Sequence, residues 1–232
     1  MLEIIESIGI KPVESNQKLI RVFTEDKYKN LFEDSAIWFS NIDSLKAEID
    51  PCERKIPDKF FEEMTSNQKE TYKKINEFKD ECIKSYVSCW SMEESASQWE
   101  TYDKEKRGLA VVTSVEKFLA VFGKDVICIE PQYINYKEDS CDLPWAIVED
   151  NCGHHRTIRI KEHYKGIDYS DDREIRFIYF DYDVSEGNNY KVNLDEIIDY
   201  IIFNPKATDE VKRSIRAYLR DKNVVIKEKM EN

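Results

Sequence analysis

The chain has 232 residues, of which 41 % are hydrophobic and 12 % aromatic, so it can bury a substantial core and does not belong to the disordered class. Its 47 acidic residues exceed its 35 basic ones, and the net charge of −12 makes a general electrostatic grip on nucleic acid or anionic lipid unfavourable. No apolar run approaches the length of a transmembrane helix, and the N-terminus lacks the basic and apolar regions of a signal peptide. We therefore expect a cytoplasmic protein with no membrane partner, whose six cysteines are reduced thiols.

The first part of the chain predicts short strands and helices, followed by a longer helical insertion. Residues 19–24 form a compact apolar run, which predicts a strand, and the pattern then predicts a helix over 25–32 and a strand over 36–40. Residues 43–56 are polar and contain a proline, which indicates a loop. Within 57–84, apolar side chains recur at spacings of three and four, which predicts an amphipathic helix.

A strand predicted over 86–90 leads into clear signals for a helix. Ser91 and Glu94 have the spacing of a capping box, and Gly108 stands where a helix-terminating residue in the left-handed conformation belongs. Trp99 and Tyr102 lie three residues apart on this helix, so we expect their rings to share one face.

The rest of the chain continues as interspersed strands and helices. We expect strands over 109–113, 126–136 (broken at Pro131), 157–161, 172–180 and 197–203, and helices over 115–122 and 207–221. The order lacks a strict βαβ rhythm, which favours the α+β class. We therefore expect a single α+β domain over 1–232, built on a twisted mixed β-sheet with flanking helices and closed by the helix at 207–221.

The strand predicted over 172–180 carries the most informative pattern in the chain. One face presents three bulky apolar residues, Ile175, Phe177 and Tyr179. The other face begins with three charged residues, Asp172, Glu174 and Arg176, and continues with Ile178 and Phe180. The pattern indicates a strand buried on both faces with a charged end, which is typical of a cleft.

The charged cluster admits three interpretations. Glu174 could act as a general base or an electrostatic stabiliser in a cleft. Asp172 and Glu174 could instead hold a metal ion in a nuclease-type site with a lysine such as Lys161. The third interpretation is a structural salt-bridge network at the end of the strand.

Arg21 interrupts the apolar run of the first predicted strand. An unpaired guanidinium is costly to bury. Arg21 therefore reaches solvent from an edge strand, pairs with Glu174, or grips a ligand phosphate with its planar fork. Trp99 and Tyr102 likewise have two interpretations, as core residues or as a stacking wall for a ring-bearing ligand.

Metal and phosphate motifs are weak in this chain. Atoms suited to zinc occur in Cys141, Cys152, His154 and His155. Their spacing matches no paired-knuckle pattern and includes no Cys-x-x-Cys, so we expect no metal cofactor. The six glycines do not cluster into a phosphate-binding loop, and nothing resembles a nucleophile elbow.

Several short motifs follow one another in an order that is more specific than any of them alone. They are Leu-Ile-Arg-Val-Phe-Thr at 19–24, Ile-Trp-Phe-Ser at 37–40, Ile-Asp-Pro-Cys-Glu at 49–53, Cys-Trp-Ser at 89–91, Trp99 with Tyr102 and Gly108, Lys161, Asp-Arg-Glu-Ile-Arg at 172–176, and Ile-Ile-Phe-Asn-Pro at 201–205. Together they resemble a large bacterial family known as a domain of unknown function, over about residues 19–224. The family has Asn-Asp-Pro-x-Glu where this chain lacks the asparagine.

The layout of that family is similar to the ADP-ribosyltransferase superfamily, which includes toxins and phage-defence proteins. The resemblance implies an ADP-ribosyltransferase-like fold in which Arg21 contacts the phosphate or ribose of NAD. It also implies a hydroxyl on a middle strand, and the candidates are Ser91, Ser88, Thr113 and Ser114.

The same resemblance implies roles for the late strand and the aromatic pair. Glu174 would hold the nicotinamide ribose and favour an oxocarbenium-like transition state through its negative charge. Asp172, which stands where the family has a glutamate, would orient or deprotonate the acceptor. Trp99 and Tyr102 would flank the nicotinamide.

Three functional hypotheses follow for a cleft formed by Arg21, Trp99, Tyr102, Glu174 and Arg176. The first is an NAD-dependent ADP-ribosyltransferase-like enzyme that uses NAD as its substrate. Its acceptor would be a protein or a small molecule rather than a long nucleic acid, given the acidic net charge. The second is a non-catalytic ligand-sensing or protein-interaction module with a structural charge cluster. The third is a metal-dependent nuclease.

Overall fold

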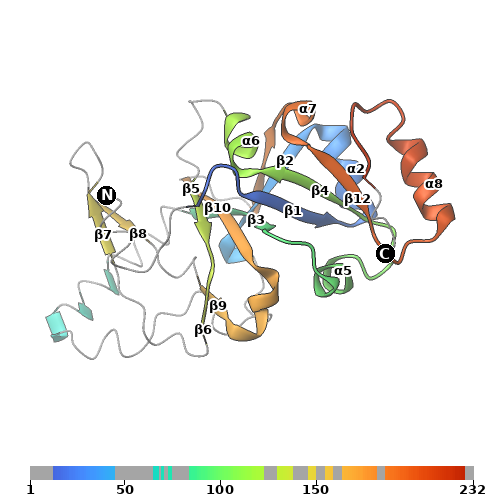
Figure 1. Ribbon diagram of the computed structural model, residues 1–232. Coiled ribbons are helices and arrows are strands. Elements are labelled where there is room, and N and C mark those ends of the chain that lie inside the picture. The colour runs from blue at the N-terminus through green and yellow to red at the C-terminus, as the bar shows by residue number, and fades with distance from the viewer. Residues whose placement is uncertain are drawn as a thin grey trace.

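The structure is a computed structural model that describes most of the chain in separate segments. The described residues are 13–44, 65–67, 69–70, 73–74, 84–122, 130–137, 146–149, 155–158, 164–181 and 186–227. One large sheet with helices on both of its faces occupies most of these segments (Figure 1).

In the described residues, the large sheet has eight strands, and its strand pairs are all antiparallel. The strands are β1 (Lys18–Phe23), β2 (Ala36–Asn41), β3 (Lys84–Ser91), β4 (Leu109–Ser114), β5 (Glu130–Tyr133), β10 (Glu174–Asp181), β11 (Gly187–Lys191) and β12 (Tyr200–Phe203). Their order is β11-β2-β3-β1-β4-β12, with β10 beside β3 and β5 beside β10. The chain is thus mixed α and β as expected, but this sheet is antiparallel where we expected a mixed one.

Two smaller sheets and several helices complete the described structure. The small sheets pair β6 (Asn135–Lys137) in parallel with β9 (Tyr164–Gly166), and β7 (Ala146–Glu149) antiparallel with β8 (His155–Ile158). The α-helices are α2 (Glu25–Asp34), α5 (Ala96–Tyr102), α6 (Val115–Ala120), α7 (Leu194–Ile197) and α8 (Asp209–Tyr218). The 3₁₀ helices are η1 (Ile42–Ser44) and η4 (Ile167–Asp172). No helix in the described segments is long and apolar enough to cross a bilayer.

Side-chain alternation along β1 explains why helices cover both faces of the sheet. All six residues of β1 pair with β4, which places Leu19 and Phe23 on one face and Ile20 and Val22 on the other. The first face belongs to the main core, to which α2, α6, α7 and α8 contribute. Helix α5 lies against the second face (Figure 1), where its Trp99 packs with Ile20.

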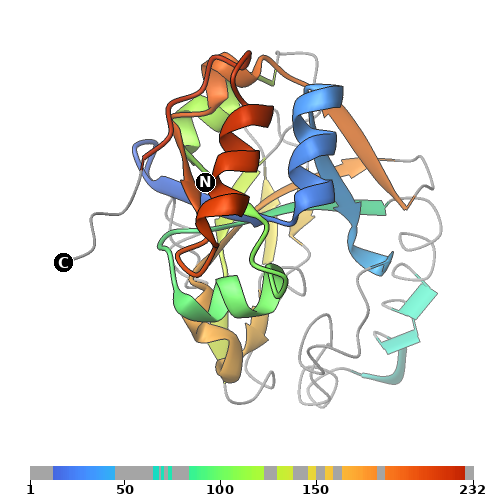
Figure 2. The ribbon, with the colours of Figure 1, turned by 90° about the vertical axis from the view of Figure 1, so that its right-hand side faces the viewer.

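Helix α2 follows β1 directly and forms one wall above the sheet. Acidic residues in its first turn suit the positive end of the helix dipole. Its buried residues Tyr28, Leu31 and Phe32 recur at spacings of three and four. Figure 2 shows α2 and α8 side by side, where the rings of Tyr28 and Tyr218 have centroids 5.7 Å apart.

The sheet forks at β3, and this fork positions the candidate site. Along one edge of β3, β2 pairs at Tyr86 and Val87, whereas β1 pairs at Ser91 through Ile20. The strands β1 and β2 therefore diverge from a single edge of β3. Arg21 follows Ile20 and lies at the point of divergence.

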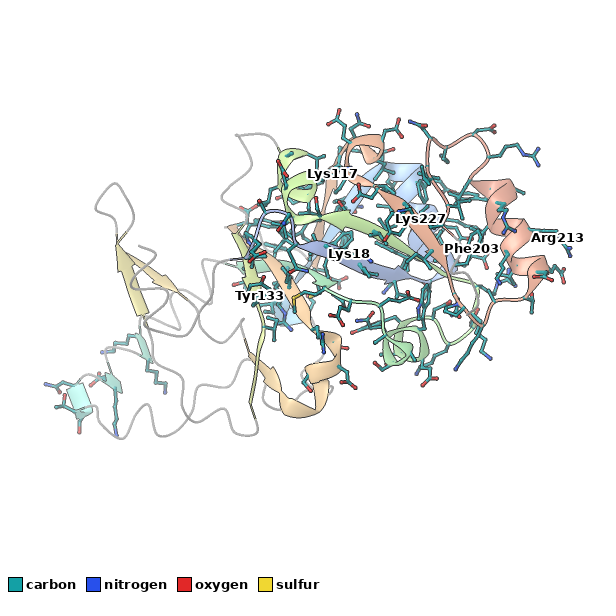
Figure 3. The ribbon with its side chains drawn as sticks, in the orientation of Figure 1. Lys18, Lys117, Tyr133, Phe203, Arg213 and Lys227 are labelled. Atoms are coloured by element: carbon teal, nitrogen blue, oxygen red, sulfur yellow. The ribbon has the colours of Figure 1, made fainter. Side chains whose placement is uncertain are left out.

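The outer edge of β12 is partly covered by the chain after α8. Ile226 forms a parallel bridge with Ile201, and the backbone N–H of Ile201 donates to the carbonyl of Val225 at 2.8 Å. The ammonium of Lys227 lies 3.7 Å from the ring centroid of Tyr200 (Figure 3). An otherwise open edge thereby gains backbone partners.

The structure corrects the helix signals predicted between Ser91 and Gly108. The capping box is formed by Ser95 and Gln98 rather than by Ser91 and Glu94. Gly108 is required for a close approach rather than a left-handed turn, because a Cβ there would lie 2.2 Å from the carbonyl oxygen of Phe23. Its N–H donates to the buried carboxylate of Asp103 at 2.9 Å.

Most other predicted elements agree with the structure. The strands predicted at 19–24, 36–40, 86–90 and 109–113 and the helices at 25–32, 115–122 and 207–221 match β1, β2, β3, β4, α2, α6 and α8. The strand expected over 197–203 is wrong in its first half, because α7 ends at Ile197 and β12 begins at Tyr200. Most of the predicted helix at 57–84 lies outside the described residues, as do Lys161, Cys141, Cys152 and His154.

Candidate functional site

The charged face of β10 contains a buried ion pair. Nε of Arg176 donates to Oε1 of Glu174 at 2.6 Å, and the two side chains are only 1 % and 5 % exposed. The apolar face is also buried through Ile175, Phe177 and Tyr179. The prediction of a strand buried on both faces with charge at one end is confirmed.

Asp172 lies outside this strand. It is the last residue of η4, and Arg173 separates it from β10 with a left-handed φ of 41°. The backbone carbonyl of Asp172 accepts a hydrogen bond from Nε2 of Gln98 at 3.3 Å, which ties η4 to α5. Asp172 and Glu174 therefore do not share one strand face, although both line the smaller cavity described below.

Arg21 lies at the fork with a neutral hydrogen-bond partner. Its Nη1 donates to Oγ of Ser88 at 2.8 Å, and Oγ also accepts from Nε1 of Trp90 at 3.1 Å. Arg21 also lies over the rings of Phe23 and Trp90, at 5.2 and 5.9 Å from their centroids. Among the described residues, Arg21 forms no ion pair.

Burial lowers the pKa of the Arg21 guanidinium, and nearby Cys89, Tyr102 and Glu174 oppose the shift. The pKa of an arginine starts so high that the group stays protonated. Partial burial, and then the charge of Arg21, also lowers the pKa of the Lys27 ammonium. The fork therefore places Lys27 close enough to Arg21 for the arginine charge to disfavour the charged form of the lysine.

A cavity of about 120 Å³ brings together five of the predicted site residues. They are Arg21, Ser91, Tyr102, Asp172 and Glu174. Ser91 is the residue opposite both Ile20 and Glu174 in the sheet, so it lies between the first and the late strand. The predicted cluster is therefore a spatial cluster, assembled from β1, β3, α5, η4 and β10.

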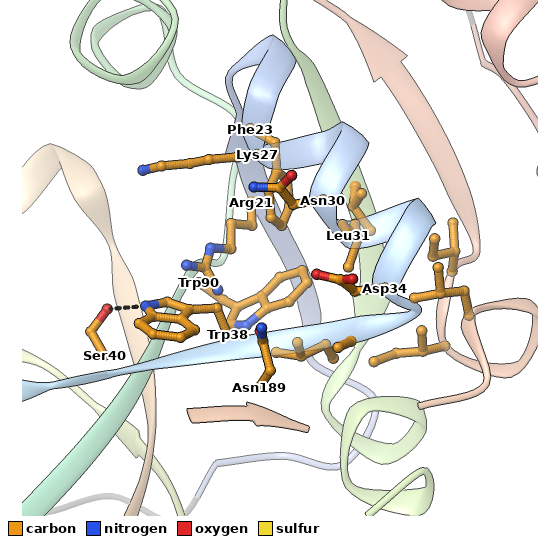
Figure 4. A pocket seen from close by; sticks show the side chains of 16 residues that line it. Arg21, Phe23, Lys27, Asn30, Leu31, Asp34, Trp38, Ser40, Trp90 and Asn189 are labelled. Atoms are coloured by element: carbon orange, nitrogen blue, oxygen red, sulfur yellow. Dashed lines mark hydrogen bonds between the residues drawn. The ribbon is translucent and has the colours of Figure 1, made fainter. Parts of the chain in front are cut away.

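A larger cavity of about 340 Å³ lies in the opening between β1 and β2. Its lining is mostly apolar, with α2 on one side and the indoles of Trp38 and Trp90 on another (Figure 4). Arg21, Lys27 and Trp90 line both cavities, so the two adjoin at these residues. The volume of the larger cavity falls within the range of small-molecule sites, about 300–1,000 Å³.

Two predicted residues lie outside both cavities. Trp99 is 4 % exposed, packs with Ile20 and Ala110, and donates through Nε1 to Glu94 at 3.0 Å. Tyr102, by contrast, is 46 % exposed and lines the smaller cavity. The two rings therefore do not form a shared wall. Arg176 also lines neither cavity, and its described contact is with Glu174.

No protein-family model matches the chain, and no curated protein or solved structure matches it significantly. The resemblance to a family therefore rests on the order of the short motifs.

Two serines of β3 are placed to supply the hydroxyl that the resemblance implies on a middle strand. Ser88 contacts Arg21, whereas Ser91 lines the smaller cavity with Glu174. Thr113 is buried on β4, and Ser114 accepts a hydrogen bond from the backbone of Lys117 at the start of α6. Of the four candidates, Ser88 and Ser91 are thus the two at the fork.

Sequence reasoning missed Lys27, Trp38 and Trp90 as cavity residues. Lys27 could have been found from α2, because Lys27, Asn30 and Asp34 form a polar stripe beside the buried positions of that helix. Within the described segments, no group of three or more His, Cys, Asp or Glu residues is placed to hold a metal ion.

Proposed function

We propose that this chain binds NAD and transfers its ADP-ribose to a protein or small-molecule acceptor. The observation that carries the proposal is Arg21, a half-buried cation with a hydroxyl as its hydrogen-bond acceptor at the wall shared by two cavities. A desolvated guanidinium gains most from an anion that presents two oxygens, as phosphate does. Lys27 adds a second positive charge on the same wall.

The smaller cavity supplies the groups for the chemical step. The C–N bond between nicotinamide and its ribose breaks, and both bonding electrons leave with the nicotinamide nitrogen. Positive charge then develops on the ribose, where the carboxylate of Glu174 stabilises it. A nucleophile of the acceptor forms the new bond to the same ribose carbon, and its proton passes to Asp172 or to water.

The ion pair with Arg176 fits this role for Glu174. The contact of 2.6 Å restrains the carboxylate on a rigid strand, and a preorganised charge needs little rearrangement during the reaction. Arg176 therefore acts in the proposal as a positioning residue, with no direct contact to NAD. Ser91, opposite Glu174 in the sheet, supplies a hydroxyl within the same cavity.

Release of nicotinamide from NAD tests the proposal. We expect the wild-type protein to release nicotinamide and Glu174→Gln to do so roughly 100-fold more slowly, because the neutral amide cannot offset the developing charge. Glu93→Gln is the matched control, since Glu93 is exposed, pairs with Arg173 at 2.7 Å and lines neither cavity. Its rate should equal that of the wild type.

Thermal melting with and without NAD separates binding from chemistry. A ligand that binds only the folded state must raise the melting temperature. A shift with no nicotinamide release would contradict the transfer reaction and favour the ligand-sensing module. No shift and no release would overturn the proposal altogether. Melting of Glu174→Gln in the absence of NAD shows whether lost activity reflects a lost fold, because this change removes the buried ion pair with Arg176.

A further inference from the structure

One face of α2 borders the larger cavity, and this face is positively charged at one end and negatively charged at the other. Lys27, Asn30 and Asp34 lie on α2 at spacings of three and four, and all three line the cavity. Lys27 stands at the wall shared with the smaller cavity, and Asp34 is the last residue of the helix. Seven residues of helix separate them by about 10 Å along the axis.

Asp34 is placed where a carboxylate does not favour the helix. The C-terminal end of a helix carries partial negative charge, and basic residues are preferred there. The last turn of α2 contains no basic residue. The side-chain carboxylate of Asp34 also has no hydrogen-bond or ion-pair partner among the described residues. Asp34 is exposed and Nζ of Lys191 donates to its backbone carbonyl at 2.7 Å, so its carboxylate remains open to the cavity that it lines.

The surroundings of Asp34 suit a flat ring that carries hydrogen-bond donors. Figure 4 shows its carboxylate directed into the same space as the indole of Trp90. The amides of Asn30 and Asn189 line the same cavity, and neither side chain has a hydrogen-bond partner among the described residues. Indoles offer faces for stacking, and the side-chain amides can donate to ring nitrogens.

We propose that the larger cavity binds the adenine of a nucleotide, with Asp34 accepting a hydrogen bond from its exocyclic amine. The phosphate then lies at Lys27 and Arg21, two helical turns from Asp34. A nucleotide has the same arrangement, with its anionic phosphate at one end and the amine of its base at the other. This inference rests on the proposed function in placing phosphate at Arg21. It adds the position of the base and the residue that selects it.

The alternative purine hypoxanthine tests the role of Asp34 directly. Hypoxanthine carries a carbonyl oxygen where adenine carries an amine, so it presents an acceptor at the position that Asp34 contacts, and its nearest donor, N1–H, lies at a different place on the ring. Two acceptors that face each other lose a hydrogen bond to a charged group, which corresponds to a preference for adenine of about tenfold or more. AMP and IMP are the probes, and their dissociation constants follow from quenching of the indole fluorescence of Trp38 and Trp90.

Three proteins complete the experiment. We expect the wild type to bind AMP about tenfold or more tightly than IMP, and Asp34→Asn to bind both within about threefold because its amide can donate as well as accept. Asp34→Asn should melt no lower than the wild type, since it removes an acid from the negative end of a helix. Glu33→Gln is the matched control, because Glu33 lies in the same turn and lines neither cavity.

The outcomes separate this inference from the proposed function. Selective AMP binding that is lost in Asp34→Asn supports the inference even where no nicotinamide is released from NAD. Equal ratios in the wild type and Asp34→Asn overturn it even where NAD is turned over. Failure of the wild type to bind either mononucleotide overturns it as well.

Discussion

Arg176 is buried and Arg21 is half-buried on neighbouring parts of one sheet, and the two guanidinium groups have different partners. Arg176 is 1 % exposed and is paired with Glu174 on its own strand. Arg21 donates to the neutral hydroxyl of Ser88 and borders two cavities. The charge of Arg176 is thus balanced by a carboxylate of the protein, whereas Arg21 could be balanced by an anionic ligand in a cavity. This difference supports the proposed role of Arg21, rather than Arg176, in binding a ligand.

The largest expected effect concerns the internally paired arginine. In Arg176→Met, the buried carboxylate of Glu174 loses its 2.6 Å ion pair, and the free energy of unfolding should fall by about 3–5 kcal/mol. Urea denaturation followed by circular dichroism measures this loss. The double variant Arg176→Met/Glu174→Gln should be more stable than the single variant, because it does not bury a carboxylate that has lost this ion pair. A loss below about 1 kcal/mol in the single variant would contradict the internal pairing.

The same substitution at the other arginine should affect binding instead of stability. In Arg21→Met, the free energy of unfolding should stay within about 1 kcal/mol of the wild type or rise, because a desolvated cation is removed and Ser88 can still accept from Trp90. The affinity for NAD should fall roughly 10- to 100-fold, the usual value of hydrogen bonds to a charged group. Isothermal titration calorimetry measures the affinity.

Arg21→Lys refines this second prediction. It keeps the positive charge but loses the planar fork, so its affinity for NAD should lie between those of the wild type and Arg21→Met. If Arg21→Met destabilises the protein as strongly as Arg176→Met does, the contrast between the two arginines is wrong.

A third arginine, Arg107, is exposed and pairs with Glu25 at the start of α2, and its removal should have the smallest effect on stability. Hydrogen bonds from Arg107, then from Lys29, lower the pKa of Glu25 to about 2 from an ordinary value of 4.5. The pKa is lower in the folded state, so this stabilisation is present above about pH 4.5 and is lost as the pH falls toward 2. Arg107→Gln should therefore cost less than about 1 kcal/mol near neutral pH.

Thermal melts between pH 7 and 3 check the third prediction. The difference in melting temperature between the wild type and Arg107→Gln should shrink as the pH falls, and added salt should reduce it at neutral pH. A difference that grows toward low pH would show that Glu25 does not gain its stabilisation from ionisation.

Much of the sheet could be predicted because its central strands are marked by local pattern. Continuous apolar residues identify β4, and the alternation of Ile175, Phe177 and Tyr179 identifies β10 with its buried charged face. The short strand β11 was missed, since its sequence Gly-Asn-Asn-Tyr-Lys has low strand propensity and depends on pairing with β2.

The site could be predicted only where one strand carries the signal. Glu174 and Arg21 stand out as charges within apolar runs, whereas the place of Asp172 depends on the left-handed conformation of Arg173, which a non-glycine residue rarely adopts. Trp99 turns toward the core because α5 packs on β1, β4 and β12. The spacing of residues along a helix does not reveal packing against strands that are distant in the sequence. The two cavities depend on the fork of β3, which no local pattern reveals.

The fork also affects the stage of folding at which the proposed ligand site forms. Arg21 and Ser88 are 67 residues apart in sequence, and β10 reaches β3 only after a further long interval. Closing such long loops costs entropy before the contacts form, which delays these pairings relative to local ones. A refolding chain should therefore recover its helical signal before its nucleotide affinity. The affinity should return only together with full protection of the backbone amides of β3 from hydrogen exchange.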